Sequence, residues 1–222
     1  MPNFVIAVDG PAASGKGTLA RRLALHYHLP YLDTGLMYRA VALSLLEKKL
    51  PLDDEDIVSR FAQSLDFERL DRRVLSEHFI GEVSSKIAVM GGLRAILVEK
   101  QRAFASRTPG AVLDGRDIGT VVCPHAQVKL YIDAESAVRA RRRYDEIISK
   151  GGLASYEQVL ADIERRDARD KGRLEGALRL AKNAHLLDTT KLSIETTFLT
   201  ACALIDPVFK MRIKVVEQSG SE

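Results

Sequence analysis

Residues 10–18 read Gly10-Pro-Ala-Ala-Ser-Gly-Lys-Gly-Thr18, and this stretch decides the fold. An apolar run rich in β-branched residues, Phe4–Asp9, comes directly before it and predicts a buried strand, whereas Leu19–Leu25 follows with helical spacing. Glycines let the backbone turn tightly, so that successive amide N–H groups point inward beside the positive end of a helix. The sequence therefore predicts a strand, an anion-binding loop and a helix, in that order.

The spacing of this loop matches the P-loop that cradles the phosphates of nucleotides, and Lys16 is placed to reach the outer phosphates as a point charge. Gly17 stands where a Ser or Thr usually binds magnesium, and the hydroxyl comes one residue later, at Thr18. We therefore expect Mg²⁺ to be held mainly by nucleotide oxygens and water, with Asp33 orienting a metal-bound water. The alternative is an ordinary turn of small residues. The candidate ATP-binding residues are Gly10, Pro11, Ala12, Ala13, Ser14, Gly15, Lys16, Gly17 and Thr18.

The composition describes a globular protein. The chain has 222 residues, of which 46% are hydrophobic and 28% are charged, values typical of a chain with a sizeable core. Its net charge of +3 is too small to indicate nucleic-acid binding by itself. Two isolated cysteines, Cys123 and Cys202, favour a reducing compartment. Because no run resembles a signal peptide or a bilayer-spanning segment, we expect a cytoplasmic protein that binds no membrane.

Further apolar runs, most of which end in Asp, predict the rest of a sheet. Helical segments separate them, which favours an α/β fold with a mostly parallel five-stranded sheet flanked by helices. In such a sheet, ligands bind beyond the carboxyl ends of the strands, so Asp114, Arg116 and Asp117 should lie near the loop. The later strands are predicted at Leu29–Asp33, Ala111–Asp114, Val128–Asp133 and Ala184–Asp188.

Other segments give weaker patterns. Leu65–Leu70 and Val74-Leu75 predict short strands, whereas Glu82–Ala105 has helical spacing interrupted by two glycines. Near the C-terminus, Ser193 is placed to cap a helix, and Pro207 should limit it.

Arginines gather on two later helices. Four of them lie within residues 139–143. After a glycine break, the spacing of residues 156–173 predicts a second helix. Because a phosphate site is already predicted, we interpret these helices as an arginine-rich lid over about residues 142–173, which closes on phosphates. The alternative is a solvated charged hairpin in which arginines merely pair with acidic residues. Those acidic residues are Asp162, Glu164, Asp167 and Asp170.

The chain contains five motifs: Asp9–Thr18, Leu32-Asp-Thr-Gly-Leu-Met-Tyr-Arg39, Gln101-Arg-Ala-Phe104, Asp114-Gly-Arg-Asp-Ile-Gly-Thr-Val-Val122 and Glu164-Arg-Arg-Asp-Ala-Arg-Asp170. Together they resemble the bacterial cytidylate kinases over nearly the full chain. The P-loop alone indicates only a nucleotide binder, and the second and fourth motifs are the most discriminating. The resemblance implies a P-loop kinase fold in a single domain, residues 1–222, with a small acceptor-binding insert at about residues 63–92 and a short lid.

The same resemblance implies that ATP phosphorylates CMP or dCMP in the presence of Mg²⁺. It implies that some side chains hold the acceptor's phosphate, that others read the cytosine, and that others face the ribose. An Asp suits the base because it accepts from the exocyclic amine that cytosine has and uracil lacks, and arginine forks suit phosphate. The implied catalytic residues are Lys16, Arg116, Arg166 and Arg173. The implied CMP-binding residues are Thr34, Arg39, Ser85, Arg94, Arg116, Asp117, Arg166, Asp170 and Arg173.

Two other functions remain open. One is a P-loop kinase for another small acceptor, such as UMP, AMP or shikimate. The other is a P-loop ATPase that grips nucleic acid with the arginines of residues 139–143. No aromatic residues interleave these arginines, whereas single-strand binders usually offer aromatic stacking platforms. We therefore expect a monomer that binds ATP and CMP or dCMP and no nucleic acid.

Overall fold

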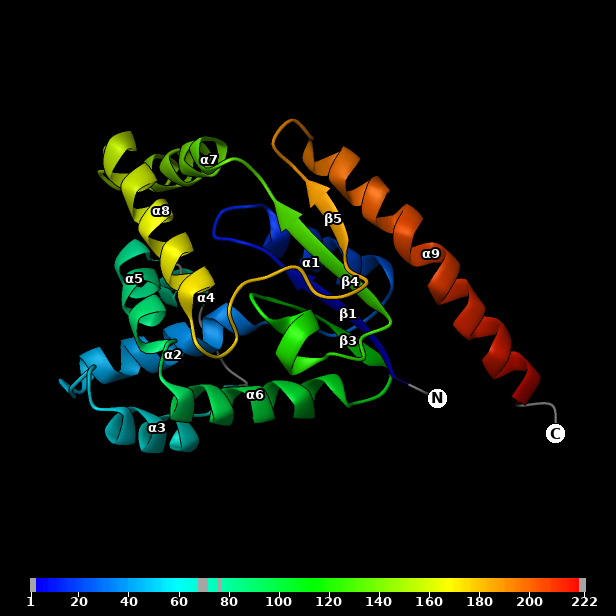
Figure 1. Ribbon diagram of the computed structural model, residues 1–222, viewed down its shortest axis with the longest axis horizontal. Coiled ribbons are helices and arrows are strands. Elements are labelled where there is room, and N and C mark those ends of the chain that lie inside the picture. The colour runs from blue at the N-terminus through cyan, green and yellow to red at the C-terminus, as the bar shows by residue number, and fades with distance from the viewer. Residues whose placement is uncertain (1–2, 68–71, 76, 220–222) are drawn as a thin grey trace.

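The computed structural model describes residues 3–67, 72–75 and 77–219 (Figure 1). Within these residues the chain forms a five-stranded sheet in which every pair of neighbours is parallel. The predicted α/β fold is confirmed. The strands are β1 (Phe4–Asp9), β2 (Tyr31–Asp33), β3 (Gly110–Gly115), β4 (Val128–Asp133) and β5 (His185–Asp188).

The strand order is β2-β3-β1-β4-β5, which places β1 at the centre. Its residue Ile6 pairs with Val112 of β3 on one side and with Val128 of β4 on the other. The chain therefore builds outward from β1 in both directions, and such a switch point opens a crevice at the carboxyl end of the central strand. Residues 10–15 leave β1 at this crevice.

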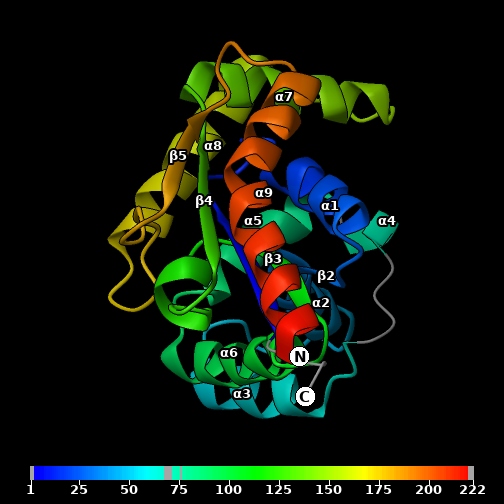
Figure 2. The same ribbon diagram turned by 90° about the vertical axis from the view of Figure 1, so that its right-hand side faces the viewer.

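Alternate side chains of β1 face two different cores. Ile6 and Val8 face α1 (Lys16–His26) and α9 (Ile194–Ser219), and they pack in one core with Leu23 of α1. The two helices lie together over one face of the sheet (Figure 2). Ala7 faces the other way, toward α6 (Gly91–Ala105) and the π-helix η1 (Ile118–Val122), where it packs with Val98. Burial of both faces explains why the strands read as continuous apolar runs.

A helical layer with its own core follows β2. It comprises α2 (Thr34–Glu47), α3 (Glu55–Ser64), α4 (Arg72–Leu75) and α5 (His78–Ile87) and packs on α6 through fully buried residues such as Leu45 and Ile87. The predicted strand at Val74-Leu75 is wrong, because Leu75 instead buries its side chain against Leu36 and Ala40 of α2. Of the strand predicted at 65–70, residues 65–67 are not in a strand, and residues 68–70 lie outside the described residues.

Two helices, α7 (Ser136–Ser149) and α8 (Tyr156–Gly172), lie beyond the carboxyl ends of β4 and β5 (Figure 1). A small core of Ala140, Val159 and Ile163 joins them. The break predicted between them is confirmed, and Gly151 turns the chain there with φ of 78°. These helices form one wall of the crevice above β1.

The C-terminal helix α9 begins as predicted, because Ser193 Oγ accepts a hydrogen bond from Thr196 N at 3.0 Å. The predicted limit at Pro207 is wrong, since α9 continues to Ser219. Pro207 is exposed, so water can satisfy the carbonyl that its missing N–H leaves unpaired. Phe209 then packs on Phe4 and Tyr27. In the part of the chain that is described, no helix has the length and apolar character needed to cross a membrane.

Candidate active site

The loop at residues 10–15 has a backbone of unusual conformation. Gly10 has φ of 154°, and an added Cβ there would collide with the carbonyl oxygen of Ile132 in β4. Gly15, at the start of α1, has φ of 90°, and Ala13 has φ of 60°. Left-handed residues next to right-handed ones turn successive N–H groups to one side and create an anion-binding concavity. The strand, loop and helix predicted from the sequence are therefore all present.

Lys16 begins α1 and lies at the mouth of this loop, with its Nζ 3.3 Å from the carbonyl oxygen of Pro11. Its side chain borders a cavity together with Asp33 and Asp114. Burial and the positive charge of Arg116 lower the pKa of Lys16 well below its usual 10.5, and the two carboxylates only partly oppose this shift. An anion bound in the cavity would favour the charged lysine.

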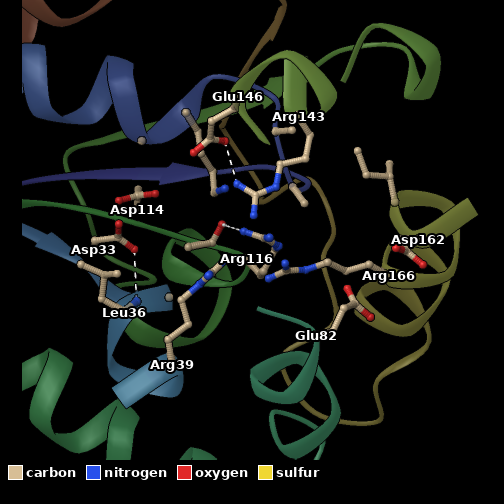
Figure 3. Close-up of a pocket in the computed structure, with 17 residues that line it drawn as sticks. Asp33, Leu36, Arg39, Glu82, Asp114, Arg116, Arg143, Glu146, Asp162 and Arg166 are labelled. Carbon is tan, nitrogen blue, oxygen red and sulfur yellow. Dashed lines mark hydrogen bonds and ion pairs between the residues drawn. The ribbon is translucent and has the colours of Figure 1, made fainter. Parts of the chain in front are cut away.

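We call the space in front of the loop the central cavity. Guanidinium groups of Arg39, Arg116, Arg143 and Arg166 converge on it from α2, the turn after β3, α7 and α8 (Figure 3). Burial, followed by the charges of other arginines, lowers the pKa of Arg166 to about 9 and that of Arg39 to about 10. Carboxylates also line this cavity, and Glu146 pairs with Arg143 at 2.7 Å. The lowered pKa values of Arg39 and Arg166 indicate that positive charge prevails around these two guanidinium groups, which favours an anionic ligand there.

Arg39 is held by backbone carbonyls of the helical layer. Its Nη1 donates to the oxygen of Leu75 at 2.7 Å and to that of Glu77 at 3.1 Å. Gly81 leaves room for the guanidinium, since an added Cβ would come within 2.7 Å of Arg39 Nη2. Helix position alone suggests an exposed arginine, but the side chain lines the cavity instead.

Asp170 of α8 binds several of the predicted arginines together. Arg116 Nε donates to Asp170 Oδ2 at 2.7 Å, Arg173 also pairs with Asp170, and Arg166 Nε lies 4.0 Å away. Burial opposes ionisation of this carboxyl, but the three arginines outweigh it and lower the pKa of Asp170 to about 2. Asp170 therefore orients the arginines while it stays ionised.

A second hollow adjoins the central cavity, and we call it the acceptor pocket because most of the residues predicted for the acceptor line it. Arg94 of α6 and Asp117 form a buried ion pair in its wall. Ser85 of α5 is also buried there, and its Oγ has no hydrogen-bond partner within the described residues. Thr34 donates to the carbonyl of Asp114 at 2.8 Å. Every residue predicted for the acceptor lines one of the two cavities except Asp170, which is fully buried and pairs with Arg116 and Arg173.

A third space lies between the loop, α7 and the turn from β5 to α9, and we call it the donor cavity because several of the residues predicted to bind ATP line it. It is lined by Ser14, Thr18, Arg142 and Thr189 among others. Sequence reasoning missed Thr189, whose Oγ1 donates to the carbonyl of Ser14 at 3.0 Å. Its position directly after β5 was the available signal, because strand ends border the crevice.

The two residues at the start of the predicted ATP set line neither the central nor the donor cavity. Gly10 instead allows the close approach to β4, and Pro11 accepts from Lys16. The remaining residues of that set border one or both cavities. Sequence reasoning also gave no role to Asp9, whose carboxylate accepts from Ile118 N at 2.7 Å and Gly119 N at 2.8 Å and so fixes the turn that carries Asp117.

A P-loop at the centre of a parallel sheet, with arginines converging on its mouth, defines the class of P-loop kinases. The family model "Cytidylate kinase" matches residues 6–206. A cytidylate kinase of Bartonella tribocorum is 59% identical over 213 residues, covering 96% of this chain and 99% of that protein. One from Rhizobium meliloti is 57% identical over 210 residues, covering 95% and 99%. The chain belongs to the cytidylate kinase family.

A solved structure of a sugar kinase from a Janibacter species matches with a TM-score of 0.50 at 15% identity, covering 92% of this chain and 95% of that one. At that identity the likeness concerns the fold alone. It agrees with the α/β fold described above.

Proposed function

We propose that this chain transfers the γ-phosphoryl group of ATP to CMP or dCMP, giving ADP and CDP or dCDP. The observation that carries the proposal is the convergence of Lys16 and four arginines on the central cavity. Two of these arginines, Arg116 and Arg166, also line the acceptor pocket, so the two spaces are adjacent. Phosphoryl transfer in line through a loose transition state needs positioning and charge neutralisation more than a covalent catalyst. The acceptor is itself a phosphate oxygen, so no strong base is required.

On the donor side, the adenosine of ATP would occupy the donor cavity. Ala13 borders both this cavity and the central one, so a nucleotide lying across it would bring its phosphates to Lys16. The amide groups of the loop would bind those phosphates. Arg143, which also borders both cavities, would neutralise charge on the transferred group.

On the acceptor side, Arg39, Arg116 and Arg166 would bind the phosphate of CMP. The base would enter the acceptor pocket, where Asp117 would accept from the exocyclic amine and the buried hydroxyl of Ser85 would find a partner. Arg166 and Asp170 would face the ribose, and Arg173 would lie near the acceptor. A carboxylate held in this way favours cytosine over uracil, which carries an oxygen at the same position.

The residues fit a magnesium ion that is held chiefly by phosphate oxygens and water. Asp33 and Asp114 border the central cavity beside Gly17, and one Asp33 oxygen accepts from Leu36 N at 3.3 Å. We propose that Asp33 orients a water bound to the ion. When bound with ATP, the ion would neutralise phosphate charge.

We further propose that the protein acts as a monomer in the cytoplasm. Every side chain assigned to the proposed site comes from one chain, so no second copy is needed to complete it. Sedimentation at concentrations used for turnover measurements would test the first point.

The experiment that tests the function is the initial rate with ATP and a panel of acceptors in an assay coupled to ADP. CMP and dCMP should be the best substrates, and UMP should be slower by about 10²-fold. Equal turnover with UMP, AMP or shikimate would contradict the proposal. ATP hydrolysis that ignores CMP, with salt-dependent RNA binding, would favour the nucleic-acid alternative; of the arginines at 139–143, however, only Arg141 is exposed.

A further inference from the structure

Arg139, the first arginine of the run at 139–143, is buried, with 4% of its surface exposed. Its Nε donates to the carbonyl of Ala134 at 2.8 Å, and its Nη1 donates to the carbonyl of Ala12 in the loop at 3.2 Å. The two Nη atoms also bind both oxygens of Asp167 in α8, at 3.2 and 2.5 Å. Arg139 lines neither the central nor the donor cavity and instead borders a separate hollow beside Pro11 and Asp167, so it is not placed to contact a nucleotide in those two cavities.

The bond to Ala12 fixes the direction of one peptide in the anion-binding loop. In a planar trans peptide, the C=O and N–H groups point to opposite sides. Because Arg139 holds the C=O of Ala12 on the outside of the loop, the N–H of Ala13 must point toward the other side. Ala13 borders both the central cavity and the donor cavity there.

This peptide needs an external restraint. Ala13 has φ of 60°, a conformation that is uncommon for residues with a side chain. Such conformations persist only where the surroundings over-determine them, and they cluster at ligand sites. A buried guanidinium that donates to the preceding carbonyl supplies a restraint of this kind.

The bond to Asp167 fixes α8 in the same way. Asp167 is followed one turn later by Asp170, which binds Arg116, and is preceded by Arg166, which enters the central cavity. Arg169 of the same helix pairs with Glu82 of α5 at 2.6 Å. The bidentate pair therefore ties the loop to the helix that carries the acceptor-side charges, since fork geometry sets both distance and direction.

We propose that Arg139 is a positioning residue that holds the donor loop and α8 in a fixed register, that is, at a fixed distance and orientation relative to each other. Through Ala12 it orients the amide of Ala13 toward the donor phosphates, and through Asp167 it places Arg166 and Asp170 opposite them. The inference rests on the proposed function, because the register matters only if groups bound on the two sides react.

Two variants separate the two bonds. Arg139→Lys keeps a positive charge beside Asp167 but loses the fork, so the carbonyl of Ala12 loses its partner. Asp167→Asn leaves the bond to Ala12 in place and weakens only the tie to α8. Arg141→Lys on the same helix is the matched control, because Arg141 is exposed and its nearest carboxylate, Asp145, lies 4.0 Å away.

The measurements are kcat with saturating ATP and CMP, ADP affinity by calorimetry, and the melting temperature. Arg139→Lys should lower kcat by about 10²-fold and weaken ADP binding by about tenfold, since misplacement of the order of 1 Å has such effects. Asp167→Asn should lower kcat by about tenfold while ADP affinity changes by less than about threefold. A residue that merely stabilised the fold would lower the melting temperature without producing this split.

Arg139→Lys with kcat and ADP affinity within about twofold of the parent protein overturns the inference. If that variant does not fold, Asp167→Asn decides, and an unchanged kcat overturns the proposal. If the parent protein itself fails to phosphorylate CMP, the proposed function fails, and the inference fails with it. An active parent with an unaffected Arg139→Lys variant contradicts the inference alone.

Discussion

The proposed donor side and the proposed acceptor side of this site are built from different kinds of groups. The donor side is one continuous loop whose backbone conformations at Gly10, Ala13 and Gly15 create the anion site, with Lys16 as its cation. The acceptor side draws side chains from α2, α5, α6, α8 and the turn after β3. Backbone amides bind any polyphosphate tail, so selectivity for one acceptor must come from the side that is assembled from distant segments.

We expect the largest loss of activity from a substitution on the donor side. Lys16→Ala should lower kcat by about 10³-fold, because the loop would keep its amides but lose the charge at its mouth. The coupled ADP assay measures this loss, and Lys182→Ala, which removes an exposed lysine, is the control. Turnover equal to that of the parent protein would mean that backbone amides alone support the reaction.

A substitution on the acceptor side should have a smaller effect, and it should alter the use of CMP but not of ATP. Asp117→Ala should raise KM for CMP by about 10²-fold and change KM for ATP by less than about threefold, because the Arg94–Asp117 pair lines the acceptor pocket and not the donor cavity. Asp117→Asn keeps an acceptor for Arg94 and serves as the check on folding. Equal losses for the two nucleotides would count against Asp117 as a reader of the base.

The acceptor side should also respond to acid. The pKa of Asp170 lies at about 2 in the folded protein, below its value of 3.8 in a model peptide. The carboxylate therefore contributes about 2 kcal/mol of stability above pH 4, and this contribution is lost as the pH falls toward 2. Urea unfolding at pH 5, 4, 3 and 2 should show the gap between the parent protein and Asp170→Asn narrowing by that amount. A gap independent of pH would contradict this assignment.

The smallest effect lies at the end of α1 away from the loop. Tyr27 donates to Asp206 of α9 at 2.8 Å. Tyr27→Phe should reduce the free energy of unfolding by about 1 kcal/mol, the usual contribution of one hydrogen bond, and leave kcat unchanged. Urea midpoints and the coupled assay measure the two quantities. A change in kcat would show that the loop depends on how α1 packs against α9.

The donor loop and the sheet could be predicted from sequence because their causes are local. Gly10 and Gly15 occupy the positions where a tight backbone needs them, and buried parallel strands appear as apolar runs that end at the crevice. Ser193 as a helix cap was predictable for the same reason. Each of these features depends on neighbours within a few residues.

The remainder depends on contacts between distant segments. Leu75 reads as part of a strand, but burial against α2 places it in a helix. Which arginine of the run at 139–143 turns inward depends on how α7 sits on the loop: Arg139 binds Ala12, whereas Arg141 is exposed. Spacing predicted that arginines gather here, but it could not predict their partners.

The crowding of guanidinium groups around the central cavity has a consequence for the lifetime of the protein. Neighbouring arginines repel the guanidinium groups of Arg39 and Arg166, and a bound anion would relieve this repulsion. Unfolded chain offers no such arrangement, so occupancy by nucleotides shifts the balance toward the native state. When nucleotides are scarce, the protein should therefore be unfolded by heat and cleaved by proteases more readily than when they are abundant.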